Sequence, residues 1–331
     1  TIYWLGAALV NNIALTDSAA RLTMFSDVLV FSTYATYVVM SFMMLVMIFM
    51  MLPQAQVSAE RINEVLERKA NIHEGSVSEC KEQGTVEFKN VSFRYPHASE
   101  DELSHISFRV NKGETLAVIG ATGSGKTTLV SLIPRFYDAT EGEVLVDGVN
   151  VRDYTFDALY NKLGYVTQKA VLFAGSIRDN VEFGESAEPA DEATLAQSIE
   201  LSQAKEFVDK LPDGTQHHVA QMGRNMSGGQ KQRLSIARAL ARKPEILVFD
   251  DSFSALDYRT DAKLREGLSK QLHDITKIIV AQRISTIRHA DKIIVLDRGE
   301  AVGIGTHEEL MQHCDVYREI ATSQLSAAEL A

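Results

Sequence analysis

The hydrophobic residues of this 331-residue chain follow two different patterns, which separate an almost uncharged first part from a periodic second part. Residues 28–52 read VLVFSTYATYVVMSFMMLVMIFMML, and no charged side chain occurs between Asp27 and Glu60. An apolar run of this length can cross a bilayer as a helix. A buried core helix is the weaker alternative, because such helices seldom stay apolar on every face for so long. The pattern therefore predicts a membrane helix at about 26–52.

The segments on either side of this run give the predicted domain boundaries. The stretch IYWLGAALV, near the start, has membrane character but is too short to span, so we interpret it as the end of an earlier membrane helix, with others before Thr1. No signal-peptide pattern precedes the apolar run. After it, Ile62, Val65 and Leu66 have helical spacing, and residues 68–84 are polar without a period. We predict a membrane domain at 1–56, and a connecting helix with a linker at 57–84.

From Thr85 onward the period changes to that of alternating strands and helices. TVEFKNVSFRY alternates like a half-buried strand, which predicts an α/β domain at 85–331. The chain has net charge −11, of which residues 1–59 carry only −1, so the second part is acidic and does not suit a nucleic-acid surface. Cys80 and Cys314 lie far apart without a ligand pattern, which fits a reduced compartment and argues against a structural zinc.

The strongest motif is a phosphate-binding loop between a strand and a helix. The segment TLAVIGATGSGKTTLVSLI contains G-x4-G-K-[ST] after an apolar strand and before a helix that we expect to begin near Thr128. Glycines let backbone N–H groups turn toward a triphosphate, Lys126 reaches the β- and γ-phosphates, and the Thr127 hydroxyl ligates Mg²⁺. The predicted phosphate contacts are Gly120, Thr122, Gly123, Ser124, Gly125, Lys126, Thr127 and Thr128.

Two acids follow a second apolar strand, in EILVFDD. A phosphate-loop site needs an acid at the end of a neighbouring strand to hold Mg²⁺ through water, and Asp250 occupies that position. By itself, the hexamer EILVFD would be better explained as a strand that happens to end on an acid. The adjacent Asp251 is the candidate for a catalytic role.

A second phosphate-binding terminus begins at Ser227, in NMSGGQKQRLSIARALAR. Ser227 is a good N-cap, and the glycines after it leave backbone N–H groups bare at a positive helix end. One triphosphate needs a single phosphate loop, so we infer that this terminus serves a nucleotide held by another copy. Its residues are Ser227, Gly228, Gly229 and Gln230.

Together these motifs resemble the ATP-binding cassette (ABC) family, whose signature is LSGGQ and whose domains dimerise head to tail around two ATP molecules. The resemblance covers essentially all of 85–331, in the family's order. It implies a P-loop α/β fold, with a RecA-like core, an antiparallel β subdomain and an α-helical subdomain, preceded by the end of an all-α transmembrane domain. The membrane segment and SAERINEVLE resemble the last helix of a bacterial exporter half-transporter, which has six membrane helices per chain.

The resemblance also assigns roles to residues outside the phosphate loop. Tyr95 in FRYP matches the aromatic that stacks on adenine, although a lone Tyr here would more often be a strand residue. Gln168 matches the glutamine that reaches Mg²⁺ and the γ-phosphate near the membrane-domain contact. The loop SALD, ending at Asp257, matches the loop that crosses to the opposite subunit.

Three positions depart from the family pattern. Asp251 stands where the family has Glu as general base, Gln282 where it has the switch-loop His, and Gln221 where exporters usually place Glu. Asp is one methylene shorter, about 1.3 Å of reach. Misplacement by 1 Å can cost on the order of 100-fold. Glutamine can bond a phosphate but cannot carry a charge or shuttle a proton.

The intact binding motifs and altered catalytic positions predict the degenerate-site subunit of a heterodimeric exporter in the plasma membrane, multi-pass, with a cytoplasmic nucleotide-binding domain. We expect ATP and Mg²⁺ as cofactors, a second half-transporter as partner, and a drug, lipid or peptide as substrate. The nearest alternative is a homodimeric exporter with two weak sites. A soluble ABC protein of translation would carry two cassettes and no membrane helix, and a regulatory ATP-binding module would not need a membrane span leading into the cassette.

Overall fold

The computed structural model describes residues 1–184 and 190–324, and it divides into two compact units, Thr1–Asn71 and Ile72–Ala331. Each unit is described by itself below.

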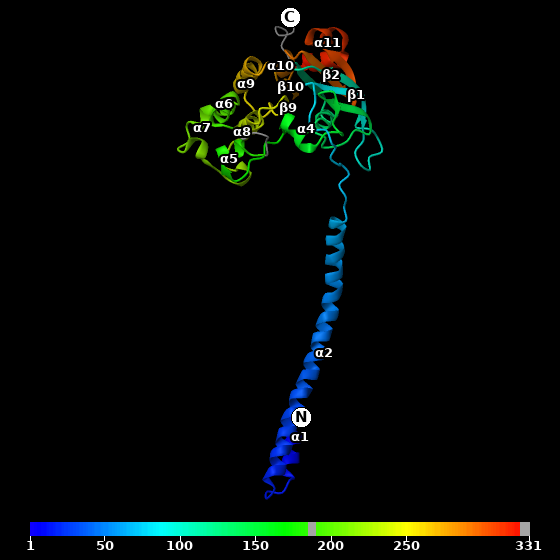
Figure 1. Cartoon of the computed structure of the whole chain (residues 1–331), viewed down its shortest axis with the longest axis vertical. Coiled ribbons are helices and arrows are strands. Elements are labelled where there is room, and N and C mark those ends of the chain that lie inside the picture. Colours follow the sequence, from blue (N-terminus) through cyan, green and yellow to red (C-terminus); the bar gives the residue numbers. More distant parts are fainter. Residues whose placement is uncertain (185–189, 325–331) are drawn as a thin grey trace. The chain divides into compact units, whose positions relative to one another are not determined.

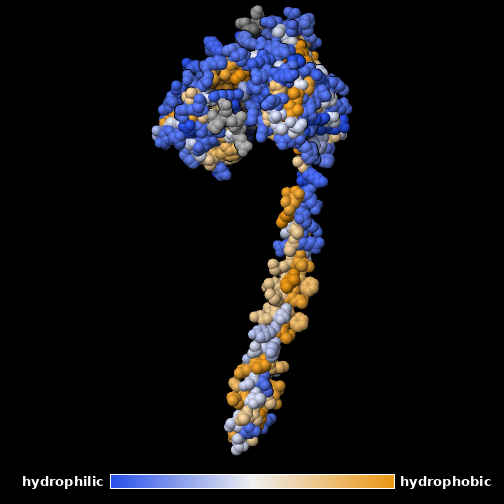
Figure 2. Space-filling model, in the orientation of Figure 1, coloured by the Kyte–Doolittle hydropathy of each residue, from blue (hydrophilic) through white to orange (hydrophobic). Residues whose placement is uncertain are grey.

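The first unit consists of two helices, α1 (Ile2–Asn11) and α2 (Ser18–Leu66). The Asp17 side chain caps α2 by accepting a hydrogen bond from the Ala20 backbone N–H at 3.1 Å. The Ser32 hydroxyl donates to the Tyr3 hydroxyl at 2.8 Å, which ties α1 to α2. Figure 1 shows α2 as one continuous rod, and in Figure 2 orange side chains cover much of it.

Helix α2 is long and apolar enough to cross a membrane. It contains both the predicted membrane span and the predicted connecting helix, and it continues without a break through Pro53. The sequence predicted that the helical segment after the apolar stretch continues the membrane helix, and in the structure the two form a single helix.

Six strands form the main sheet of the second unit, in the order β12-β11-β3-β10-β9-β6. The strands are β3 Thr115–Gly120, β6 Leu163–Val166, β9 Ile246–Asp250, β10 Thr276–Val280, β11 Lys292–Asp297 and β12 Glu300–Gly305. Neighbours run parallel except β11 and β12, which pair antiparallel. In β3, Leu116 and Val118 join one hydrophobic core, whereas Ala117 and Ile119 join another. Because successive residues face opposite sides, burial of both faces explains the continuous apolar runs.

A four-stranded antiparallel sheet, in the order β2-β1-β4-β5, shares the core of Leu116 and Val118. Its strands are β1 Val86–Phe93, β2 Leu103–Val110, β4 Glu141–Val146 and β5 Val149–Asn150. Phe88 pairs with Phe108 across β1 and β2, and their rings stack at 4.5 Å between centroids. Helices α3 (Lys126–Ser131) and α4 (Phe156–Lys162) contribute to the same core.

The opposite core is covered by the C-terminal helices. These are α9 Tyr258–Gln271, α10 Ile284–Ile287, α11 His307–His313 and α12 Asp315–Gln324. Their buried residues, such as Leu264, Ile287, Leu310 and Tyr317, pack with Ala117 and Ile119 of β3.

A separate helical group has its own core, and Figure 1 shows it to one side of the sheets. It comprises α5 Ile177–Val181, α6 Glu192–Leu201, α7 Lys205–Val208, α8 Gly228–Ala241, the short strands β7 Gly175–Ser176 and β8 His218–Val219, and the 3-10 turns η1 Gly214–Gln216 and η2 Gln221–Gly223. Helix α8 joins this core through Leu234 and the core of the main sheet through Ile236.

Part of the polar segment 68–84 is hydrogen-bonded within the second unit. The Gly75 N–H donates to the Tyr154 carbonyl at 2.9 Å, and the Phe156 N–H donates to Glu74 Oε1 at 3.0 Å. Val77 forms an isolated parallel bridge with Tyr154. The domain boundaries drawn from the sequence remain predictions, and these contacts show where the chain first attaches to the α/β fold.

Candidate nucleotide-binding site

The phosphate loop lies between β3, which ends at Gly120, and α3, which begins at Lys126, two residues before the predicted start. Gly123 has φ +81° and Gly125 has φ +92°, a region that residues with a Cβ rarely adopt. Nothing lies within 4 Å of the position that a Gly123 Cβ would take, so the loop backbone faces open space there. At Gly120 a Cβ would come within 2.1 Å of the Leu296 carbonyl oxygen, which requires glycine.

Lys126 is only 9% exposed and is folded back on the loop. Its ammonium donates to the carbonyl oxygens of Gly120 at 2.9 Å and Ala121 at 2.7 Å. Burial lowers the pKa of Lys126, and the carboxylates of Asp250 and Asp251 oppose that shift. A buried ammonium held by neutral carbonyls gains from a stronger anionic partner, and a phosphate would be one.

The loop hydroxyl and the strand-end acid are in contact as predicted. The Thr127 hydroxyl donates to Asp250 Oδ1 at 2.9 Å, although the two residues lie 123 positions apart. Burial raises the pKa of Asp250, the hydrogen bond from Thr127 lowers it, and the neighbouring Asp251 raises it. A hydroxyl and a carboxylate are hard oxygen donors of the kind Mg²⁺ prefers, and a cation would favour the ionised carboxylate that burial disfavours. The donor set therefore fits Mg²⁺, with phosphates and water completing the coordination.

The three residues predicted to be catalytic are joined by hydrogen bonds, because the two glutamines donate to the same oxygen of Asp251. Asp251 Oδ2 accepts a hydrogen bond from Gln282 Nε2 at 2.8 Å and another from Gln168 Nε2 at 3.2 Å. Gln168, Asp251 and Gln282 follow β6, β9 and β10, which are adjacent parallel strands, so their carboxyl ends meet at one edge of the sheet. Asp251 is 6% exposed and has φ +45°, a conformation that Asp tolerates better than most residues. The Gln168 amide is thus hydrogen-bonded to Asp251, and its predicted contact with Mg²⁺ stays a prediction.

Tyr95 lies against the residue that follows the loop threonine. Its hydroxyl is 3.0 Å from Thr128 Oγ1, and its ring makes edge contacts with Phe93 and Tyr137. The side chain is half-buried. The Tyr95 hydroxyl therefore lies next to the start of α3, and the adenine contact stays a prediction.

The signature segment begins helix α8 with a reciprocal cap. The Gln230 N–H donates to Ser227 Oγ at 3.3 Å, and Gln230 Oε1 accepts from the Ser227 N–H at 2.8 Å. The Gln230 side chain, predicted to contact nucleotide, is therefore engaged in the cap. Ser227 and Gly228 are exposed, and a Cβ on Gly228 would meet nothing within 4 Å. The position of a Gly229 Cβ lies 3.4 Å from the Ala255 carbonyl oxygen, so the signature adjoins the loop that ends at Asp257.

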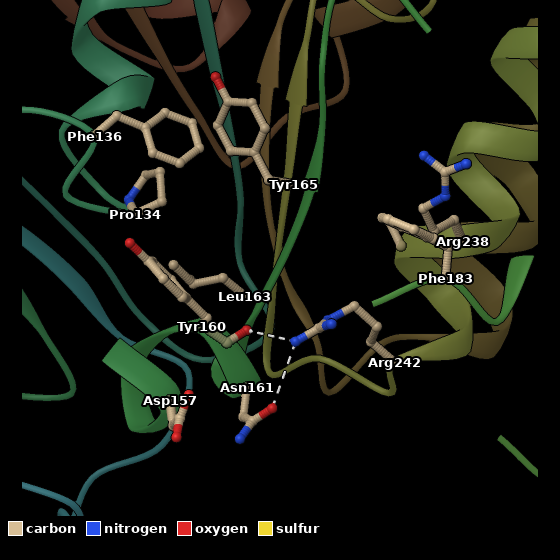
Figure 3. Close-up of a pocket in the computed structure, with 11 residues that line it drawn as sticks. Pro134, Phe136, Asp157, Tyr160, Asn161, Leu163, Tyr165, Phe183, Arg238 and Arg242 are labelled. Carbon is tan, nitrogen blue, oxygen red and sulfur yellow. Dashed lines mark hydrogen bonds between the residues drawn. The ribbon is translucent and has the colours of Figure 1, made fainter. Parts of the chain in front are cut away.

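A groove that the motifs did not predict lies between α4, β6 and α8. It encloses about 760 Å³ and is lined by Pro134, Phe136, Asp157, Tyr160, Asn161, Leu163, Tyr165, Phe183, Arg238, Ala239 and Arg242. Figure 3 shows the Phe136 and Tyr165 rings facing each other on one wall, with Arg238 and Arg242 on the opposite wall. Burial raises the pKa of the Tyr165 phenol, and so does the negative charge of the nearby Asp250 carboxylate. Tyr165 therefore connects the groove to the predicted Mg²⁺ site.

The sequence gives no usable sign of this groove, and its exposed aromatic residues are the only feature that hints at it. Phe136 and Phe183 remain about half exposed, and single exposed aromatics are common enough to carry no sequence signal. The residues come from segments more than 100 positions apart, without any motif to associate them.

Residues 103–254 match the family model described as ABC transporter. An uncharacterized ABC transporter ATP-binding protein of Mycobacterium tuberculosis is 44% identical over 308 residues, which cover 91% of this chain and 52% of that protein. A solved structure of a bacterial Atm1-family ABC exporter with ATP bound superimposes with a TM-score of 0.77 at 31% identity, covering 90% of this chain and 53% of that one. The second unit contains an ABC transporter ATP-binding domain. The predicted fold class is thereby confirmed.

Other relatives of the ABC domain carry names that mention transport. The putative multidrug export ATP-binding/permease protein YgaD of Bacillus subtilis is 44% identical over 245 residues, 73% of this chain and 41% of that protein. An ATP-dependent lipid A-core flippase of Xanthomonas oryzae pv. oryzae is 40% identical over 270 residues, 82% of this chain and 46% of that protein. The chain spans about half the length of the curated relatives that it matches.

Proposed function

We propose that this chain is part of an ABC exporter and that it couples ATP binding and hydrolysis to the movement of a drug, lipid or peptide across the plasma membrane. The observation that carries the proposal is the meeting of Thr127 with Asp250, next to a buried Lys126 and an open glycine loop. The relatives named as a multidrug exporter and a lipid A-core flippase support an apolar or amphipathic substrate.

In this proposal one set of residues binds the nucleotide and Mg²⁺, and another set positions the attacking water. The phosphate-loop N–H groups and Lys126 hold the phosphates, Tyr95 stacks on adenine, and Thr127 and Asp250 hold Mg²⁺. Bound Mg²⁺ would neutralise charge that develops on the transferred phosphoryl group. Asp251 orients the attacking water, with Gln168 and Gln282 fixing its carboxylate.

We further propose that this is the degenerate site of a heterodimer. Every group that binds ATP has the expected chemistry, whereas Asp251 is one methylene short of Glu and Gln282 cannot shuttle a proton. The exposed Ser227 and Gly228 would complete the partner's site, where most of the hydrolysis would take place. A homodimer with two weak sites is the alternative.

For the membrane part, we propose that α2 is the last membrane helix of a multi-pass domain and that the ATP-binding domain is cytoplasmic. Its length and hydropathy, together with its place before the cassette, support this.

The test uses the full-length protein in vesicles, alone and together with the product of a neighbouring transporter gene. We expect rapid ATP hydrolysis only in the mixed complex, and substrate-dependent stimulation of it. Equal activity of the chain alone would favour the homodimer. A protein that binds Mg-ATP but neither hydrolyses it nor moves a substrate in either preparation would indicate a regulatory module.

A further inference from the structure

The C-terminal helix α12 (Asp315–Gln324) ends beside the predicted catalytic residues. Tyr317 and Ala321 are fully buried in the core that covers the main sheet, and the Tyr317 hydroxyl lies 2.7 Å from His307 Nδ1 of α11. Helix α12 is therefore anchored along its length. Gln324, its last residue, lines a cavity of about 310 Å³ together with Asp251 and Gln282.

The Gln324 amide makes two hydrogen bonds to the backbone of the switch loop, which here means the segment from Gln282 to Ile284. Its Nε2 donates to the Gln282 carbonyl oxygen at 2.8 Å, and its Oε1 accepts from the Ile284 N–H at 2.9 Å. A primary amide offers a donor and an acceptor side by side, so one side chain holds the backbone on both sides of Arg283.

The contact to Ile284 supplies a cap that the switch loop lacks. Helix α10 begins at Ile284, and its N-cap residue Arg283 makes no capping hydrogen bond from its side chain. The first N–H groups of a helix have no partner inside the helix. Gln324 satisfies one of them from a distant element, 40 positions along the chain.

We propose that Gln324 is a positioning residue for the catalytic cluster, and this rests on the function proposed above. The backbone of Gln282 is held by Gln324, and the Gln282 side chain donates to Asp251 Oδ2 at 2.8 Å. Helix α12 thus holds Gln282 in place, and the Gln282 amide in turn holds the Asp251 carboxylate. In this assignment Gln324 acts through the backbone of Gln282 and Ile284.

The experiment compares Gln324→Met, Gln324→Glu and the control Ser323→Ala in the full-length assembled transporter. Methionine matches glutamine in length but makes neither bond, whereas Glu can still accept from Ile284 but cannot donate to Gln282. Ser323 is an exposed neighbour whose hydroxyl bonds only within α12, to Ile320. The readouts are ATP affinity, single-turnover hydrolysis at this chain's site, and amide hydrogen exchange of the peptide covering 282–287.

Gln324→Met removes two hydrogen bonds and should slow single-turnover hydrolysis by about tenfold. A factor of that size corresponds to the net free energy of roughly one hydrogen bond lost from the transition state. ATP affinity should change less than about twofold, because the residues proposed to bind the phosphates and Mg²⁺ are unchanged. Amide hydrogen exchange of the 282–287 peptide should become about tenfold faster. Gln324→Glu should fall between Gln324→Met and the wild type in exchange, and Ser323→Ala should match the wild type.

Unchanged exchange and turnover in Gln324→Met would overturn the assignment, and so would a loss of ATP affinity as large as the loss of turnover. If the wild-type transporter hydrolyses no ATP, the proposed function fails. The exchange measurement then still decides whether Gln324 holds the switch loop.

Discussion

The double change Asp251→Glu with Gln282→His should raise hydrolysis at this chain's own site, and its magnitude can be worked from the structure. The added methylene advances the carboxylate by about 1.3 Å. Correcting a misplacement of about 1 Å is worth on the order of 100-fold, or about 2.7 kcal/mol. The cavity beside Asp251, about 310 Å³, gives the longer side chain room.

The backbone at Asp251 affects the folding stability of the variant rather than this gain. At φ +45° a Glu is less tolerated than an Asp, at a cost of roughly 1 kcal/mol. That strain is the same in the ground state and the transition state, so it lowers folding stability and leaves the expected gain for the double variant on the order of 100-fold.

Asp251→Glu alone should gain less than about threefold, because Gln282 still cannot take up or release a proton. The assay is single-turnover hydrolysis in the proposed heterodimer, with the partner's site disabled at its phosphate-loop lysine. Asp251→Asn, measured in the complex with both sites intact, should slow turnover far less than removing the partner's general base.

Two results would refute this reasoning. Wild-type hydrolysis at the Asp251 site as fast as at the partner's site would return Asp251 to the role of an adequate general base. A full gain from Asp251→Glu alone would show that reach is the sole defect and that the amide at 282 is no obstacle.

Three further predictions test the other parts of the site. Lys126→Ala should abolish Mg-ATP binding, because the phosphates lose their buried cation; equilibrium dialysis with labelled ATP checks this, and unchanged binding would exclude the assignment. Gly228→Asp should leave the melting temperature within about 2 °C, since the Cβ position is open, yet remove most ATPase activity of the complex by placing a carboxylate against the partner's nucleotide. Asp250→Asn should raise the free energy of unfolding of the nucleotide-free protein at pH 7. Burial raises the pKa of Asp250 in the folded state, so ionisation of this carboxyl destabilises the fold as the pH rises through that pKa. Asparagine cannot ionise and avoids this loss. The advantage of Asn should disappear below the ordinary pKa of 3.8, and thermal melts across pH measure it, with a constant difference at all pH values counting against the argument.

The parts of the site that lie at strand ends could be predicted from the sequence. An apolar run that stops on a polar residue marks the carboxyl end of a buried strand, and parallel strands bring such ends together. Asp250 was predicted in this way, Thr127 from the phosphate-loop motif, and Gln168 and Gln282 only from the resemblance to the ABC family. In the structure Thr127 contacts Asp250, and both glutamines contact Asp251.

The contacts that could not be predicted depend on tertiary packing between segments without a motif. Gln324 reaches Gln282 because α12 is anchored by buried side chains, and a glutamine near the end of an amphipathic helix gives no sign of this in the sequence. The left-handed φ of Asp251 is likewise a property of the turn after β9. The engagement of Gln230 in a helix cap follows from a Ser-x-x-Gln pattern, which the resemblance to a nucleotide-binding signature obscured.

The geometry around Asp251 supports the proposal that this site holds ATP and cleaves it slowly. A general base must present a free lone pair to its water within hydrogen-bonding distance. Two amides donate to Oδ2 of Asp251, so that oxygen is engaged on both sides, and the remaining oxygen sits on the shorter side chain. An imidazole at 282 could release its bond by changing its charge, whereas the Gln282 amide donates in the same way throughout the physiological pH range. The hydrogen bonds thus stabilise the carboxylate and the loops that carry it. In the proposal, the site is slow because Asp251 has too little reach and Gln282 cannot relay a proton.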